Sequence, residues 1–229
     1  ALLTPPHGPA VMIDAGPARE AERILRQARA RGVNRLAVLV LTKPDADFVG
    51  GAAAWIERGL VQEIWTTPDP GRSPVFTRLL AQARAHNLPV RVLAAGEQGR
   101  WPGGLTWEVH NPPAATAAQP AAGPLVLRVG AGSQAVWFMT AASSTLETEL
   151  AARPFEAGAT VLVLSQHGAA GAAQPDWLAR VRPDWVVISV GAGNYEGAPA
   201  PAVLEALAKD GWPVWRTDLA GAFTLRWIP

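Results

Sequence analysis

The sequence contains no cysteine, which excludes disulfide bonds and metal sites built on thiolates. It has no apolar run close to the roughly 18 residues that a membrane-spanning helix needs. The longest apolar runs, at 36–41 and 160–164, have the length of a strand. The first residues lack the basic and apolar regions of a signal peptide, and no segment repeats at a fixed period.

Neither sign of charge dominates, because 20 Lys and Arg face 19 Asp and Glu, for a net charge of +1. Such a balance gives no strong overall attraction to nucleic acid. Arginines nevertheless cluster in residues 23–35, where a local basic face can form. Hydrophobic residues make up 49% of the 229 residues and charged ones 17%, so the chain can bury a full core and is not disordered.

Short apolar runs alternate with helical stretches. Residues 36–42 are apolar at almost every position, as in a strand buried on both faces. Residues 18–32 have an apolar face and end in Gly32, which is typical of an amphipathic helix. Strands and helices in alternation predict a mixed α/β layered fold. We expect strands at 10–14, 36–42, 61–67, 90–94, 105–112, 160–165 and 185–190, helices at 18–32, 50–59, 73–87 (N-cap Ser73, then Pro74), 144–152, 175–181 and 200–211, and hairpins over 125–140 and 214–228.

Polar residues and glycines gather where the predicted strands end. These positions are Asp14 to Gly16, Lys43 to Gly51, His167 with Gly168, and Gly191 to Gly197. Polar groups at strand ends, with glycines that let backbone approach, are the usual construction of a site on an α/β scaffold. Residues 112–124 are rich in Ala and Pro and predict a surface loop, so we expect one domain over 1–229.

Six segments resemble motifs of the metallo-β-lactamase superfamily, in the same order along the chain. The closest resemblance is to the metallo-β-lactamase-like domain of ComEC-type DNA-uptake proteins, and it covers essentially the whole chain. It implies a four-layer αβ/βα sandwich of two mixed sheets with outer helices. The segments are VMIDAGP (11–17), 31–55, AVWFMTAAS (135–143), VLVLSQHGAAG (161–171), 181–207 and 211–227.

The first metal loop of that family has the form T-H-x-D-x-D-H-x-G-G. In this chain Lys43 stands at the position of the first His and Phe48 at that of the last. Asp45 and Asp47 keep the two carboxylates. The resemblance therefore implies a loop that has lost both of its imidazole ligands.

Three later motifs of the family have changed as well. The bridging carboxylate of Thr-Gly-Asp is replaced by Ala142, and the His-His-Gly segment begins with Gln166 and keeps only His167. The final G-H-P-H stretch has Ala198 at the first His position. A two-metal hydrolytic site needs several imidazole and carboxylate ligands around an activated water. We therefore expect no resident metal, no small-molecule cofactor and no retained catalytic residue.

Lys43 suggests what replaces the metal. We hypothesise that its ammonium supplies the missing positive charge by pairing with Asp45 or Asp47. Phe48, Ala142 and Ala198 would then fill the emptied site with apolar bulk. If a metal is held at all, the residues left for it are Asp45, Asp47 and His167, with one weakly bound Mn²⁺ or Zn²⁺.

Three functions follow from this resemblance. The first is an inactive scaffold or DNA-path element of a DNA-uptake system, an extracytoplasmic domain that contacts single-stranded DNA and the membrane channel portion of the same longer chain. The sequence lacks an initiator Met, and we expect it to be a segment of such a chain. The second is a residual single-metal nuclease that acts on the non-transported strand. The third is a protein-interaction domain without a nucleic-acid role.

Simpler explanations exist for the same residues. Asp45 and Asp47 suit strand-to-helix turns, and His167 can be an ordinary loop histidine. Asp14 is expected to order its loop through hydrogen bonds. His7, His86 and His110 lie outside the family's ligand motifs, and Asn194, Tyr195 and Glu196 can line a pocket. Gly191 to Gly193 match neither a dinucleotide motif nor a P-loop.

Ten tryptophans are many for this length. Aromatic side chains interleaved with Arg can stack on single-stranded bases. Four of them lie in or beside predicted strands and are expected in the core: Trp65, Trp137, Trp185 and Trp215. The positions left open are Trp101, Trp107, Trp212 and Trp227.

Overall fold

The computed structural model describes residues 1–5, 8–68, 73–116, 122–156, 158–194 and 196–227. His7 and Tyr195 lie outside these residues. The chain groups into two compact units, the first made of Ala1–Leu105 with Asn111–Leu125 and the second of Thr106–His110 with Val126–Pro229. The expected single domain stays a prediction.

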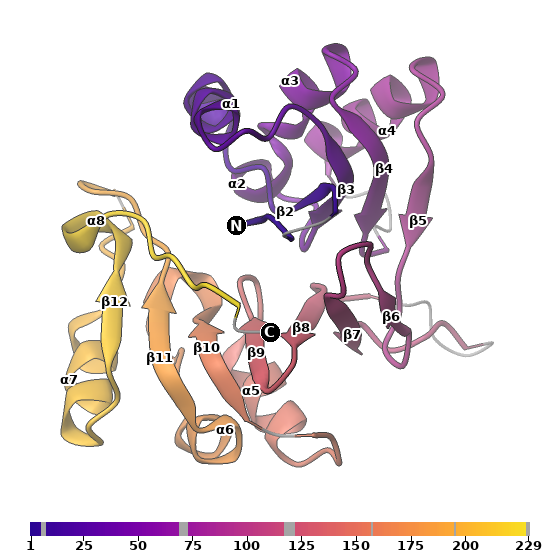
Figure 1. Cartoon of the computed structure of the whole chain (residues 1–229). Coiled ribbons are helices and arrows are strands. Elements are labelled where there is room, and N and C mark those ends of the chain that lie inside the picture. Colours follow the sequence, from indigo (N-terminus) through magenta and orange to yellow (C-terminus); the bar gives the residue numbers. More distant parts are fainter. Residues whose placement is uncertain (6–7, 69–72, 117–121, 157, 195, 228–229) are drawn as a thin grey trace. The chain divides into compact units, whose positions relative to one another are not determined.

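The first unit contains a mixed sheet in the order β1-β2-β3-β4-β5 (Figure 1). β1 runs antiparallel to β2, and the other neighbours are parallel. The central strand β3 is almost entirely buried, as its apolar run predicts. The strands are β1 (Leu2–Leu3), β2 (Ala10–Ile13), β3 (Leu36–Leu41), β4 (Val61–Thr66) and β5 (Val90–Val92), and the unit also includes β6 (Gln98–Arg100).

Helices α1, α3 and α4 lie side by side on one face of this sheet (Figure 1). Their apolar residues, such as Leu25, Trp55 and Phe76, share one hydrophobic cluster with the strands. Helix α4 begins as predicted, because the Ser73 hydroxyl accepts a hydrogen bond from the Phe76 amide. The helices of this unit are η1 (Ala18–Glu20), α1 (Ala21–Ala30), α2 (Ala46–Val49), α3 (Ala52–Glu57) and α4 (Pro74–Ala85).

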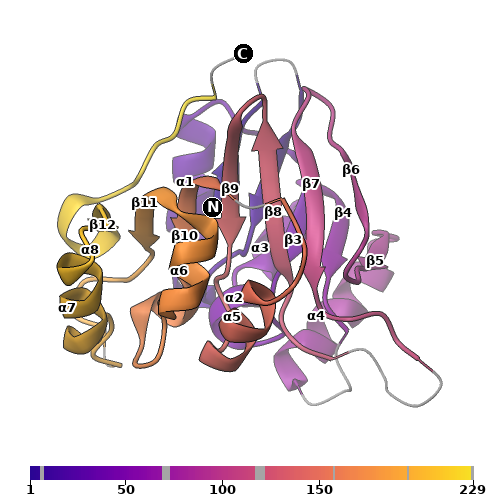
Figure 2. The same cartoon turned by 90° about the horizontal axis from the view of Figure 1, so that it is seen from below.

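The second unit contains a mixed sheet that runs from β12 through β11, β10, β9 and β8 to β7. Strands β9 to β12 are parallel, and β8 pairs antiparallel with β9 as the predicted hairpin. Helices α5, α6 and α7 cover one face of it (Figure 2). The elements are β7 (Thr106–Asn111), β8 (Val126–Ala131), β9 (Gln134–Phe138), α5 (Ser144–Ala151), β10 (Ala159–Val163), η2 (Ser165–Gly168), α6 (Pro175–Val181), β11 (Pro183–Ile188), α7 (Pro201–Lys209), β12 (Val214–Arg216) and α8 (Thr217–Ala220).

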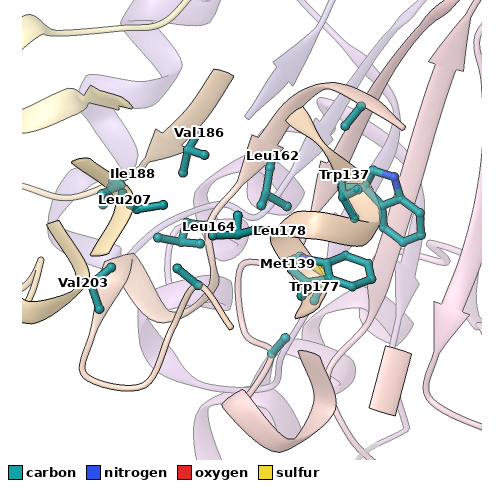
Figure 3. Packing of buried hydrophobic residues seen from close by; sticks show 14 of the residues in the cluster. Trp137, Met139, Leu162, Leu164, Trp177, Leu178, Val186, Ile188, Val203 and Leu207 are labelled. Carbon is teal, nitrogen blue, oxygen red and sulfur yellow. The ribbon is translucent and has the colours of Figure 1, made fainter. Parts of the chain in front are cut away.

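The core of the second unit joins large aromatic side chains to aliphatic ones from the central strands (Figure 3). Trp137 on β9 meets Trp177 on α6 edge to face, with ring centroids 5.1 Å apart. Leu162, Val186 and Ile188 line the same core beside them. The expected class, α/β with two mixed sheets and flanking helices, is confirmed.

The predicted closing hairpin over 214–228 is wrong. β12 pairs in parallel with β11, and the chain then enters the short helix α8 in place of a second strand. The turn occurs at Thr217, whose hydroxyl accepts from the Val190 amide at 2.8 Å and ties the chain to the end of β11. Residues 221–227 form no strand.

No helix within the described residues has both the length and the apolar character needed to cross a membrane.

Candidate functional site

One group of candidate residues lies in the first unit, where the parallel neighbours β2 and β3 end. Asp14 follows β2 with a φ of 58°, and its two carboxylate oxygens accept from the amide and the hydroxyl of Thr42, both at 2.8 Å. Asp tolerates the left-handed conformation better than most residues that have a side chain. Asp14 therefore orders the two loops, as expected from the sequence.

Two glycines hold the loop that follows β3 against the turn that follows β2. The Gly51 amide donates to the Gly16 carbonyl at 2.8 Å. A Cβ at Gly51 would lie 2.3 Å from the carbonyl oxygen of Ala15, and one at Gly50 would lie 2.6 Å from that of Ala46. No side chain fits there, so this close approach explains the pair of glycines.

Lys43 and Asp45 form an ion pair at the start of this loop. The Lys43 Nζ lies 2.6 Å from Asp45 Oδ2 and 6.0 Å from the centre of the Phe48 ring. Asp45 occupies the N-cap position of α2 but makes no capping bond with its side chain. The pairing is the one hypothesised from the sequence. The side chains are 42% and 50% exposed, so the pair contributes only about 0–1 kcal/mol to stability.

The other two residues of this loop have different environments. Asp47 is exposed in the first turn of α2. Phe48 is partly buried and packs against the hydrophobic cluster of the first unit. Phe48 thus provides apolar bulk at its position, and a carboxylate remains at Asp47.

Another group of candidate residues lies in the second unit, at the ends of β9, β10 and β11. The Gln166 amide donates to the Thr140 carbonyl at 2.9 Å, and its side-chain Nε2 donates to the Ala142 carbonyl at 3.0 Å. The Ala200 amide donates to the Gly168 carbonyl at 2.8 Å. These bonds bring together the three later motifs that the sequence singles out.

His167 sits in a strained turn. Gln166, His167 and Gly168 have φ angles of 45°, 57° and 77°, a run of left-handed residues that costs free energy where the residue has a Cβ. The His167 Nδ1 lies 2.5 Å from the carbonyl oxygen of Ser189. A contact of this kind fixes the orientation of an imidazole ring.

Glu147 supports this turn from helix α5, and the sequence reasoning missed it. Its side chain is fully buried and accepts hydrogen bonds from the Ser165 hydroxyl and from the Gln174 amide, the latter at 2.7 Å. Burial raises the pKa of Glu147, and these hydrogen bonds oppose the rise. The signal was present in the sequence, since Glu147 lies between Leu146 and Leu150 on the apolar side of its helix.

The residues present do not fit a two-metal centre. Ala142 and Ala198 are 1% and 7% exposed and pack in the hydrophobic cluster of the second unit, where a methyl group offers no lone pair. The carboxylate of Asp45 already faces an ammonium. Within the described residues, no three His, Asp or Glu side chains gather as metal ligands would.

Two of the other candidate polar residues, Asn194 and His110, make contacts that stabilise the fold. Asn194 bonds to the carbonyl and the amide of Ala198 at 2.7 and 3.0 Å, which closes the loop between them. His110 packs on Trp137 with ring centroids 4.4 Å apart, and burial lowers its pKa. His86 and Glu196 are exposed.

The tryptophans divide differently from the prediction. Trp65 and Trp137 are buried as expected, but Trp185 is 39% exposed, so its assignment to the core is wrong. Its side chain lies on the face of β11 opposite to Val186, which the helices cover. Its ring meets those of Trp215 and Phe223, both partly buried. Of the positions left open, Trp101 and Trp107 are buried, and Trp212 and Trp227 are partly buried.

No protein-family model matches the chain. ComE operon protein 3 of Bacillus subtilis is 25% identical over 199 residues, which cover 86% of this chain and 25% of that protein. The chain therefore spans about a quarter of the length of that relative.

Solved structures with the same fold match most of the chain. The metallo-beta-lactamase fold protein YhfI from Bacillus subtilis has a TM-score of 0.58 at 11% identity, over 94% of this chain and 87% of its own. Zn²⁺-bound PqqB from Methylobacterium extorquens has a TM-score of 0.53 at 14% identity, over 94% and 84%. Identities this low show the fold alone. The chain thus has the metallo-β-lactamase fold.

Proposed function

We propose that the chain is a catalytically inactive metallo-β-lactamase-fold domain of a DNA-uptake system. It serves there as a scaffold or DNA-path element outside the cytoplasm, joined to a membrane channel portion of a longer protein. The similarity to ComE operon protein 3 and the six motifs in order support the assignment to this system. The altered ligand positions support the loss of catalysis.

The observation that carries the proposal is the ion pair between Lys43 and Asp45. An ammonium 2.6 Å from the carboxylate opposes binding of a cation there, because the two positive charges would repel each other. A metal site needs a group with a free lone pair at this position, and a protonated lysine instead adds a positive charge. The methyl groups of Ala142 and Ala198 remove further ligands in the second unit.

Metal content tests the proposal. The protein is dialysed against Mn²⁺ or Zn²⁺ and then against metal-free buffer, and bound metal is measured by elemental analysis beside a chelator-treated sample. We expect far less than one ion per chain. One ion per chain that is lost in both Asp45→Ala and His167→Ala would overturn the proposal.

A residual hydrolase is the second candidate, and the contact between His167 Nδ1 and the Ser189 carbonyl favours it, because ligating histidines are commonly oriented in this way. Asp45 and Asp47 would be its other metal-binding residues. Cleavage of single-stranded DNA that requires Mn²⁺ or Zn²⁺ and disappears in Asp45→Ala would support this candidate. Absence of cleavage with both metals would count against it.

A further inference from the structure

Helix α1 and its flanks carry an unusual concentration of arginine. Six arginines lie within residues 19–35, and all of them are exposed. Glu20 and Glu22 are the only acidic residues in this segment, so its net charge is +4, while the whole chain has +1. The arginines are Arg19, Arg23, Arg26, Arg29, Arg31 and Arg35.

The two glutamates of this segment already have partners. Glu20 pairs with Arg23 at 2.5 Å, and Glu22 pairs with Arg58 of the neighbouring α3 at 2.5 Å. Among the described residues, no carboxylate lies within ion-pair distance of the other five arginines. The α1 arginine surface is defined by these five: Arg19, Arg26, Arg29, Arg31 and Arg35.

We propose that the α1 arginine surface binds the phosphodiester backbone of nucleic acid. Guanidinium groups match phosphate oxygens in a bidentate geometry, and release of counterions from the strand drives such contacts. The segment from residue 19 to 35 contains no aromatic residue that could stack on a base. Base stacking by this segment is therefore excluded, and the proposed contacts are to the phosphates.

The burial of α1 favours nucleic acid over a lipid surface. A membrane-bound amphipathic helix inserts its apolar side between the lipids. In α1 the apolar side is already taken, since Ala21, Leu25 and Ala28 are buried in the core of the first unit. The exposed side offers charge without apolar residues large enough to insert, which suits a hydrated polyanion.

The inference rests on the DNA-related part of the proposed function but uses none of the altered metal-site residues. Binding is measured by fluorescence anisotropy with a labelled 20-nucleotide oligothymidylate at 50 mM salt, in the presence of EDTA. The test variant is Arg26→Ala with Arg29→Ala. A second variant, Arg26→Lys with Arg29→Lys, keeps the charge. The matched control, Arg100→Ala with Lys209→Ala, removes two exposed cations elsewhere.

We expect the alanine variant to bind about tenfold more weakly and its log–log salt slope to fall by about 1.4, at about 0.7 for each lost contact to a single strand. The lysine variant keeps both charges, so its salt slope should match that of the original protein, and the affinity of the control should stay within about twofold. Unchanged melting temperatures show that all variants fold.

Two results would overturn the inference: an equal loss in the control, or no binding of the oligonucleotide at 50 mM salt, whether or not the protein then binds phosphatidylserine vesicles. Because EDTA is present throughout, failure here leaves the metal measurement of the proposed function untouched.

Discussion

Single carboxylates hold the loops of this fold in place. Both carboxylate oxygens of Asp14 accept hydrogen bonds from Thr42. The buried carboxylate of Glu147 accepts hydrogen bonds from Ser165 and Gln174. Buried or partly buried polar groups are tolerated when they are hydrogen-bonded, and removal of one partner leaves the other unsatisfied. These side chains fix the backbone at the strand ends.

Glu147 makes stability depend on pH. Its pKa is raised in the folded protein, so the folded state binds a proton more tightly than the unfolded state, whose value is near 4.5. The free energy of unfolding should therefore fall as pH rises from 4.5 through the raised pKa, and the contribution is fully present below 4.5. Urea unfolding of the original protein and of Glu147→Gln from pH 4.5 to 7.5 measures this.

Glutamine keeps a carbonyl oxygen for the Gln174 amide and an NH₂ group for the Ser165 hydroxyl, so the variant should fold. Its stability should decline less over this range than that of the original protein. Identical pH profiles for the two proteins would show that Glu147 does not titrate there.

At the scale of elements, the loops that follow neighbouring strands are held together by close packing and hydrogen bonds. The loop after β3 packs against the turn after β2 through Gly50 and Gly51, and the turn in η2 bonds to the chain after β9 through Gln166. The contact through Gly50 and Gly51 requires two backbone segments to lie close together. The contact through Gln166 requires residues in the left-handed conformation. Both arrangements lie beside the candidate residues of their unit.

Gly51→Ala should lower the free energy of unfolding by about 1–3 kcal/mol, because the new methyl carbon would lie 2.3 Å from the Ala15 carbonyl oxygen and must displace backbone. Gly191→Ala is the control, since nothing lies within 4 Å of its Cβ position and its φ is ordinary. That change should stay within about 0.5 kcal/mol. Chemical denaturation compares the two, and equal stabilities would refute the packing argument.

At the scale of the whole molecule, each unit has its own hydrophobic cluster. Val126, Trp137 and Leu207 belong to one cluster, and Leu25, Leu39 and Trp55 belong to the other. Apolar burial is the main favourable term in folding, so these two clusters are the main source of stability in their units.

If the proposed loss of the metal site is right, the melting temperature should not depend on metal. A resident site at a hundredfold excess of ligand over its dissociation constant would add about 2.7 kcal/mol, a shift of several degrees in a thermal scan. We expect the same melting temperature, within about 1 °C, in EDTA, Zn²⁺ and Mn²⁺. A rise of several degrees with either metal would contradict this expectation and would indicate a metal site.

Much of the fold could be predicted because its signals are local. The apolar run of β3 and the Ser73-Pro74 start of α4 act over a few residues. The closing hairpin could not be predicted, because a short apolar run after 214 fits either an antiparallel or a parallel partner. The assignment of Trp185 to the core was wrong for a related reason. A position in a strand does not by itself say which face of the sheet is covered by helices.

The sequence motifs gave the candidate residues, but they did not give the contacts that these residues make. The sequence placed Lys43 near two carboxylates, and the structure selected Asp45, with Asp47 left exposed. Nothing in the spacing pointed to the bond of Gln166 with the Ala142 carbonyl. The apolar neighbours of Glu147 in its helix indicated that it is buried but not which groups it contacts. These contacts join residues far apart in the chain.

The sequence alone determined the α/β class, the order of the motifs and the residue types at positions 43, 48, 142 and 198. These depend on residue type and local periodicity. Tertiary structure decided the partner of Lys43, the exposure of Trp185 and the burial of Glu147. It also left the arginines of α1 facing solvent, because the core took the opposite side of the helix. Such outcomes depend on which surfaces pack together, and packing is settled only when distant segments meet.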